Sequence, residues 1–505
     1  MAGSGDADYD VVIIGGGISG LYTAWRLGNT TKLKILVLEA TDRLGGRFLT
    51  CEMPGGFNAD LGAMRFSPDC HPLLDSLLKH LEVSSRTLVQ VDDEKNVFNY
   101  FIRNKHLRTI DEVKNVFSIS DSELEHASAA FRLDFGKPKG FGLEVNEDGD
   151  YSTSIVQSTG QLAQDVSIAQ YLLETNNSEL YNLARTLFPP RGWPLSIAES
   201  FLNQLCKHWD VVKMVDGGYE QIIRAISSSL STCPTVHVKH EMKVKSITEK
   251  EGLFSVKLAK NEVSCKKVIF ACSHTGLQSI RLEHQESRQE KLNHMMNKIE
   301  LVPSFKIYLT YRRAWWEDGG VFEGNVTSDW PNQLCVIFGD SGQTKSYATL
   351  VAAYTYENVE LYRNLDIEAN KRFVCTAGDV RRELVPSKVL VDHVHKALKK
   401  IMSCPHVKDQ PVCAARMFWG TDTQGATSYY PKCGVDSNQL HWDSLKPFED
   451  ADMYITGDLF PAWDEKGVNL GFTEMPLLTA ERILTNHFGL EPFVDGICVR
   501  NLWPK

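Results

Sequence analysis

The sequence predicts an α/β fold in which the start, the middle and the end of the chain build one domain together. Three observations predict it: an apolar run that enters a glycine-rich turn near the N-terminus, a second apolar strand that ends on an acidic residue, and a short apolar strand before a helix near the C-terminus. The chain has 505 residues, of which 43% are hydrophobic, and this length favours two or three domains.

The glycine-rich turn follows residues 11–14, an apolar run typical of a buried parallel strand. Gly15 makes the tight turn, Gly17 lets the backbone approach a pyrophosphate, and Gly20 lets the next helix pack on the strand. A phosphate would then lie on the free N–H groups at the start of a helix over residues 21–27. The pattern therefore predicts a phosphate-binding loop.

The second strand, residues 34–38, ends on Glu39. This carboxylate lies close to the ~20-residue offset expected for a group that binds a ribose. The two strands and the helix between them form a βαβ unit of roughly 30 residues, as such units require. The alternative, a glycine-rich loop in another strand–loop–helix unit, leaves Glu39 unexplained. We therefore expect a discontinuous Rossmann-type dinucleotide-binding domain.

The remaining sequence predicts a mixed-sheet substrate domain and a helical insertion. Helical spacing, as in residues 121–132 and 196–208, marks the insertion, and we also expect a helix over residues 473–488 with Pro476 in its first turn. Strand patterning occupies residues 97–102, 236–238, 242–247, 267–272, 304–311, 346–354 and 453–458. The expected domains are residues 9–66, 213–298 and 448–490 (dinucleotide-binding), 67–120 and 299–447 (substrate), and 121–212 (insertion).

Composition narrows the range of partners. The net charge is −10 and the pI is about 5.9, so nucleic acids and anionic membranes are poor candidates. Apolar runs are of strand length, which argues against a membrane span, and the N-terminus has no signal-peptide pattern, as expected of a cytosolic protein or a mature form. The 12 cysteines include no CxxC pair, so the sequence indicates neither a metal site nor a redox pair.

Four segments resemble motifs of the flavin amine oxidase family: residues 39–47, 62–65, 455–458 and 471–474. Within the family, Gly-Ala-Met-Arg at residues 62–65 and the stretch 304–331 are most similar to L-amino-acid oxidases of snake venoms and molluscs. The resemblance covers nearly the whole chain and implies FAD as the cofactor. It further implies that hydride passes from the substrate Cα to flavin N5. L-Amino acids would thereby be converted by dioxygen to 2-oxo acids, ammonia and hydrogen peroxide, and a homodimer is suggested.

The resemblance also implies a set of cofactor-binding residues. Glu39 would bind the ribose hydroxyls, Val244 the adenine through its backbone, Arg47 a phosphate, and Asp458 the ribityl chain, unless Asp458 is only a turn residue. The dipole of the helix near Thr473 would point its positive end at the flavin. The full set is Gly15, Gly17, Ile18, Ser19, Gly20, Glu39, Ala40, Arg47, Gly62, Ala63, Met64, Arg65, Val244, Asp458, Gly471, Phe472, Thr473 and Glu474.

A second set would act on the substrate. Arg65 would hold the α-carboxylate with its fork of donors, the alternative being a structural ion pair. Lys306 would hold a water near flavin N5. It shares a strand face with Tyr308 and Thr310, and the alternative is an exposed strand lysine. The other expected substrate-binding residues are Gly471, Phe472, Trp419 and His208, with Trp463 a further candidate for the pocket wall.

Two departures from the L-amino-acid oxidase pattern stand out. The tyrosine pair that helps hold the carboxylate is replaced by residues 335–338, Cys-Val-Ile-Phe, and the Gly-Trp lid is Gly471-Phe472. Two other functions on the same fold are the alternatives: a polyamine or monoamine oxidase, and a non-enzymatic carrier. A polyamine or monoamine oxidase has no use for Arg65, and a non-enzymatic carrier of prenylated GTPases has no use for Glu39, Arg47 and Asp458 together.

Overall fold

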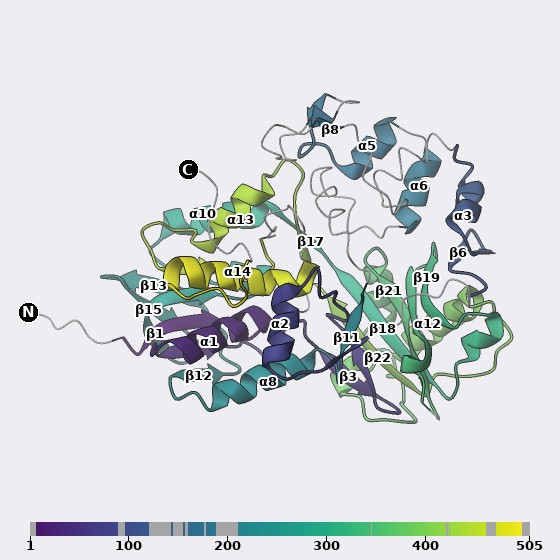
Figure 1. The fold of residues 1–505 in the computed structure, drawn as a ribbon, viewed down its shortest axis with the longest axis horizontal. Helices are drawn as coiled ribbons and strands as arrows, with labels where there is room; N and C mark the ends of the chain where they lie inside the picture. The colour runs from purple at the N-terminus through teal and green to yellow at the C-terminus, as the bar shows by residue number, and fades with distance from the viewer. Residues whose placement is uncertain are drawn as a thin grey trace, which may run out of the picture.

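Two sheets dominate the computed structural model, which describes residues 7–88, 96–120, 143–144, 155–156, 160–175, 178–187, 211–344, 346–420, 423, 425–460 and 471–496. One sheet has 8 strands and the other has 7. Figure 1 shows them side by side, with helix α2 (Pro72–His80) between them and α5 (Ile168–Thr175) and α6 (Ser178–Leu187) set apart above the second sheet. This arrangement confirms the predicted α/β fold class.

The first sheet combines distant parts of the chain. Its order is β12-β2-β1-β15-β14-β13-β16, with β24 also paired to β15. The pairs from β12 to β15 and the pair β15–β24 are parallel, whereas β13, β14 and β15 form an antiparallel meander. The strands are β1 (Tyr9–Ile14), β2 (Ile35–Leu38), β12 (Val236–Lys239), β13 (Ser246–Lys250), β14 (Leu253–Lys257), β15 (Glu262–Phe270), β16 (Arg281–Leu282) and β24 (Met453–Ile455).

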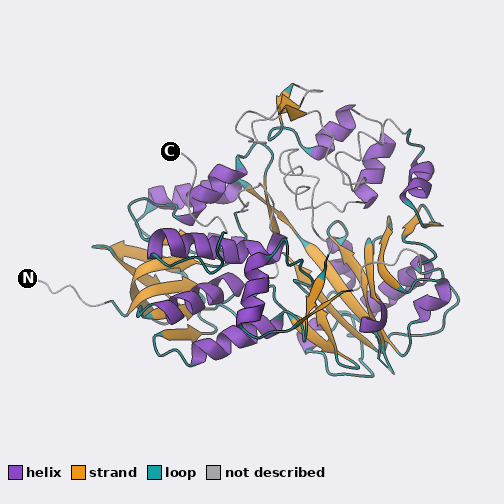
Figure 2. Ribbon diagram, viewed as in Figure 1, coloured by secondary structure: helices purple, strands orange, loops and turns teal. Residues whose placement is uncertain are grey.

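Both faces of the first sheet are buried, which explains its continuous apolar strands. Val11 and Ile13 pack into one core with helices α1 (Ile18–Thr30), α8 (Glu220–Ser231) and α14 (Gly471–Phe488). Val12 and Ile14 face the opposite core, which includes residues of α10 (Glu286–Asn297) and α13 (Ser437–Leu445). Figure 2 shows the helices gathered around this sheet.

The second sheet is mixed, as predicted, and has the order β22-β18-β21-β20-β19-β6-β7. Strand β18 (Ser304–Tyr311), which lies between β22 and β21, is buried at every position. Phe305, Ile307 and Leu309 pack toward α12 (Lys388–Ile401), whereas Tyr308 packs toward the hairpin of β3 and β4, so the predicted alternation is confirmed. The other strands are β6 (Tyr100–Ile102), β7 (Lys105–Leu107), β19 (Glu323–Ser328), β20 (Leu334–Phe338), β21 (Ala348–Thr355) and β22 (Cys413–Trp419).

Smaller elements connect and cover the two sheets. The strand pairs are β3 (Thr50–Met53) with β4 (Phe57–Asp60), β5 (Ser85–Thr87) with β11 (Lys213–Val215), and β17 (Ile299–Val302) with β23 (Ser428–Pro431). The remaining α-helices are α3 (Ile110–Phe117), α9 (His274–Gln278) and α11 (Val359–Leu365), and the 3-10 helices are η2 (Trp315–Gly319), η3 (Gly339–Gly342) and η4 (Arg382–Leu384). No helix among the described residues is long and apolar enough to cross a membrane.

The structure differs from the sequence prediction in two places, and two further predictions are not tested by it. The described part of the insertion contains, besides α5 and α6, a small sheet of β8 (Leu143–Glu144), β9 (Ile155–Val156) and β10 (Gln161–Leu162), whose strands are too short to give a pattern. Helix α14 begins at Gly471, so Pro476 falls in its second turn rather than its first. The helices expected over residues 121–132 and 196–208 lie outside the described residues, and the domain limits stay a prediction.

Candidate active site

The glycine-rich loop leaves space at the start of α1. A Cβ atom at Gly20 would lie 2.0 Å from the Gly15 carbonyl oxygen, so only glycine allows α1 to pack this closely on β1. A Cβ atom at Gly17 would meet nothing within 4 Å, and Gly17 is the N-cap of α1 without a side-chain cap. The first N–H groups of α1 therefore face an open cradle suited to a phosphate.

Glu39 lies at the end of β2, beside this loop. Its carboxylate accepts hydrogen bonds from the Gly16 N–H at 2.7 Å and from the Thr41 N–H and hydroxyl at 2.8 and 2.7 Å. The Met242 N–H donates to the Glu39 carbonyl at 2.8 Å, which brings the segment before β13 alongside. Val244 lies buried in that segment, just before β13 rather than within the strand as predicted. The nucleotide-binding candidates are thus close together.

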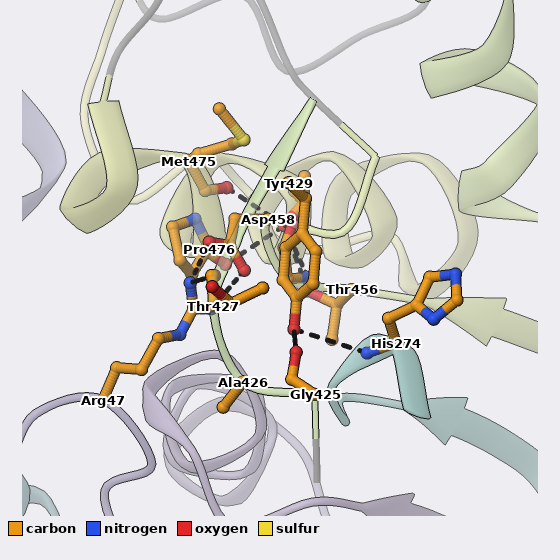
Figure 3. A network of polar contacts seen from close by, with 12 residues as sticks. Arg47, His274, Gly425, Ala426, Thr427, Tyr429, Thr456, Asp458, Met475 and Pro476 are labelled. Carbon is orange, nitrogen blue, oxygen red and sulfur yellow. Dashed lines mark hydrogen bonds and ion pairs between the residues drawn. The ribbon is translucent and has the colours of Figure 1, made fainter. Parts of the chain in front are cut away.

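Arg47 and Asp458 form an ion pair that joins the N-terminal segment to the end of β24 (Figure 3). The fork of Arg47 donates to both carboxylate oxygens, and Nη1 also donates to the Thr427 carbonyl at 2.7 Å. Burial tends to lower the pKa of Arg47, but the Asp458 carboxylate outweighs it and raises the pKa above its usual value. Asp458 is only 4% exposed, so it is more than a solvated turn residue.

The first turn of α14 carries one group without a partner. The Thr473 Oγ1 atom is buried and has no hydrogen-bond partner among the described residues. Glu474, its neighbour, turns instead to α2, where its carboxylate accepts from the N–H groups of Leu73 and Leu74 at 2.6 and 2.9 Å. Burial raises the pKa of Glu474 to about 8. Thr473 therefore offers a hydroxyl to a ligand, whereas Glu474 caps a helix.

Three side chains of the second sheet hold the backbone of residues 60–62, which we call the clamped segment. Lys306 Nζ donates to the carbonyls of Asp60 and Gly62 at 3.1 and 2.8 Å. Tyr308 donates to the Asp60 carbonyl at 2.9 Å, and Trp419 Nε1 donates to the Leu61 carbonyl at 2.8 Å. Lys306 is 2% exposed, so the alternative of an exposed strand lysine is wrong.

Arg65 lies just beyond the clamped segment and is half-buried. Its charge is close enough to lower the pKa of Tyr308 and Tyr219, although burial, the larger effect, raises both well above the usual value. Tyr354 on β21 is paired with Lys306, whose Nζ lies 4.8 Å from the centre of the tyrosine ring. The strand register thus brings Lys306 and Tyr354 together, and Arg65 acts on Tyr308 of the same strand as Lys306.

Asp60 and Tyr354 are site residues that the sequence did not reveal. Asp60 Oδ1 accepts from the Thr50 hydroxyl at 2.6 Å and the Tyr219 N–H at 3.0 Å, whereas the buried Oδ2 has no partner in the described part of the chain. Burial raises the pKa of Asp60 to about 7, against the effect of its hydrogen bonds and the Lys306 charge. The sequence signal that could have pointed to Asp60 is its position two residues before Gly62, where the motif at residues 62–65 begins.

Two expected substrate residues lie outside the description. His208 and Trp463 are outside the described residues, and for Gly471 and Phe472 only the helical backbone is described. Trp419 lies beside Gly62, since a Cβ atom there would come 3.3 Å from its indole ring. Within the described ranges, no group of three or more His, Cys, Asp or Glu residues could hold a metal ion.

Comparison with known proteins identifies the family. A model of the "Flavin containing amine oxidoreductase" family matches residues 18–459. The chain therefore belongs to this family, and its expected membership is confirmed. FAD is the cofactor that the family uses, and the open cradle at Gly17, the carboxylate of Glu39 beside it and the Thr473 hydroxyl, which has no partner among the described residues, fit it.

Individual relatives are distant. Achacin of Lissachatina fulica is 23% identical over 69% of this chain and 71% of its own length. The L-amino-acid oxidase of Crotalus adamanteus is 23% identical over 71% of this chain and 68% of its own length. The L-amino-acid oxidase of Mus musculus is 25% identical over 69% of this chain and 54% of its own length, so this chain spans about half of that protein.

Solved structures of similar fold include putrescine oxidases. One with bound putrescine has a TM-score of 0.65 and 18% identity, and the match covers 95% of this chain and 99% of that one. A mutant of putrescine oxidase from a redesign of cofactor binding has a TM-score of 0.66 at 18% identity, and the match covers 94% of this chain and 99% of the mutant. At this identity the likeness shows the fold.

We propose that Arg47 contributes to the affinity for FAD by presenting its donors to the cofactor phosphates, with Asp458 fixing its position. Arg47→Met should weaken FAD binding about ten- to a hundredfold, because charge-assisted hydrogen bonds contribute about 1.5–3 kcal/mol each. Flavin absorbance retained after dialysis against graded FAD measures this. Arg313→Met, which removes a surface arginine paired with Asp318 and Asp409, is the control and should bind FAD normally. Equal FAD affinity in both variants would refute the role of Arg47.

Proposed function

We propose that this protein is an L-amino-acid oxidase. The observation that carries the proposal is Arg65, a half-buried cation whose charge acts on Tyr308 next to the Lys306–Tyr354 pair. A guanidinium in a partly dry pocket is suited to a carboxylate, which it can bind through two parallel hydrogen bonds. Amines without a carboxylate offer Arg65 no comparable partner. The L-amino-acid oxidases among the relatives support the same substrate class.

Tyr354 is the proposed second carboxylate-binding group. The tyrosine pair typical of L-amino-acid oxidases has no counterpart on β20, since residues 335–338 are Cys-Val-Ile-Phe. Tyr354 lies on the adjacent strand β21, and its hydroxyl contacts that of Tyr356. The Tyr354 charge state affects the pKa of Tyr308, as the Arg65 charge does, which indicates that both groups lie near the same hydroxyl. In this proposal Arg65 and Tyr354 both donate hydrogen bonds to the substrate carboxylate.

The chain's own residues would orient the substrate and hold charge. Bound FAD supplies the redox chemistry by accepting a hydride from the substrate Cα and returning electrons to dioxygen, which leaves as hydrogen peroxide. Arg65 fixes the Cα–H bond by holding the carboxylate, so part of its effect appears in the chemical step. Lys306 places a buried positive charge at the clamped segment, where it favours negative charge that develops nearby.

An oxidase of diamines or monoamines is the competing function. The likeness to putrescine oxidase extends to the fold and carries no argument about the substrate. The substitution of Arg65 separates the two functions directly.

Arg65→Ala should lower kcat/KM for L-amino acids by roughly two to four orders of magnitude, because two charge-assisted hydrogen bonds to the carboxylate are lost. Arg65→Lys should remain poor, since a point charge does not reproduce the fork. Steady-state peroxide release measures both variants. An amine with the same side chain but no carboxylate is the matched substrate and should be nearly unaffected. If the amine suffers as much as the amino acid, Arg65 is structural.

Lys306→Met should retain FAD and slow the reaction of the reduced enzyme with oxygen by tenfold or more. The reason is that the substitution removes the buried cation at the clamped segment, and each factor of ten in rate corresponds to about 1.4 kcal/mol. Stopped-flow mixing of reduced enzyme with oxygen measures the rate. Tyr308→Phe is the matched control, since it removes a hydrogen bond to the same Asp60 carbonyl without removing a charge. Equal slowing in both variants would mean that Lys306 acts only by holding the clamped segment.

A further inference from the structure

We propose that Cys375 and Cys413 form a site of reversible oxidation that closes to a disulfide on exposure to hydrogen peroxide. Cys413 is a fully buried residue of β22, whereas Cys375 is half-buried in a loop outside the regular elements. Their sulfur atoms lie 3.4 Å apart, with the Cys413 thiol donating to Cys375. The inference concerns modification of the protein and does not rest on the proposed substrate.

The backbone already holds the two cysteines in position. The Thr376 N–H donates to the Val412 carbonyl at 2.8 Å, so the residues that flank the two cysteines are joined. A disulfide needs a sulfur–sulfur distance of about 2.0 Å, which a small movement of the Cys375 loop would give. Val374, next to Cys375, is 67% exposed, so this side of the loop faces solvent.

Cys375 has the features of the attacking thiol. The hydrogen bond from Cys413 lowers the pKa of Cys375 to about 7; burial opposes this, and the Ala414 N–H adds to the lowering. Cys413 correspondingly keeps its proton, since its pKa is raised. Burial instead raises the pKa of several other thiols, which makes them inert. These are Cys51, Cys265, Cys272, Cys335 and Cys404.

The oxidation balances with one peroxide per thiol pair. The Cys375 thiolate attacks one peroxide oxygen, the O–O bond breaks, and the second oxygen leaves as hydroxide that is protonated to water. Cys413 then gives up its proton, and its sulfur displaces the hydroxyl group from the Cys375 sulfenic acid, which leaves as a second water. The two thiols lose two electrons and two protons, and peroxide is reduced to two waters. Because peroxide is the product of the proposed oxidase, the site would respond to the enzyme's own turnover.

The test uses the full-length holoenzyme, reduced first and then treated with a few equivalents of added hydrogen peroxide. Free thiols are blocked with N-ethylmaleimide, and the unreduced digest is examined by mass spectrometry. A cross-linked peptide pair containing Cys375 and Cys413, two hydrogens lighter than the separate peptides and lost on reduction, is expected. Cys375→Ser and Cys413→Ser should each abolish it. Cys433→Ser should not, because this exposed thiol donates to the Gln164 carbonyl.

Other outcomes overturn the proposal. If both thiols remain open to N-ethylmaleimide at peroxide levels that oxidise methionines, the pair is unreactive. If Cys375 proceeds to the sulfinic acid while Cys413 stays reduced, the geometry does not permit the second step. Because peroxide is added, the result is independent of whether the protein oxidises amino acids.

Discussion

The candidate site depends on one buried ammonium group that holds the segment preceding Arg65 against the second sheet. Lys306 extends from β18 of the second sheet and donates to two backbone carbonyls of the clamped segment, which lies at the end of β4. Buried carbonyls need donors, and a buried lysine needs acceptors, so each satisfies the other. Tyr308 and Trp419 add two further donors from the same sheet. The segment that precedes Arg65 is thereby fixed against the second sheet.

A second constraint is the concentration of positive charge at the site in a chain whose net charge is −10. Arg47, Arg65 and Lys306 are buried or half-buried, and FAD and the proposed amino-acid substrate would both bring anionic groups to them. Burial meanwhile raises the pKa of Asp60 to about 7 and of Glu474 to about 8, which weakens the opposing negative charge. The interior thus favours anions although the surface as a whole repels them.

Local sequence signals predicted the strands at the core of the first sheet and several residues of the candidate site. The turn at Gly15, the offset of Glu39 and the alternation around Lys306 are short-range patterns, and the structure bears out the placement of all three. The ion pair of Arg47 with Asp458 joins residues 411 apart, and the Lys306–Tyr354 contact depends on the register of two strands. Neither has a local pattern, so neither could be read from the sequence. The same holds for Glu474, whose carboxylate caps α2 across the domain.

The most direct test of the account is a peroxide-release screen of the purified holoenzyme. The substrates are the proteinogenic L-amino acids, their D enantiomers, and the decarboxylated amines with the same side chains. We expect turnover of one or more L-amino acids and little or no turnover of the matching amines. Turnover of amines such as putrescine, with L-amino acids inert, would contradict it and assign the site to amine oxidation without a carboxylate.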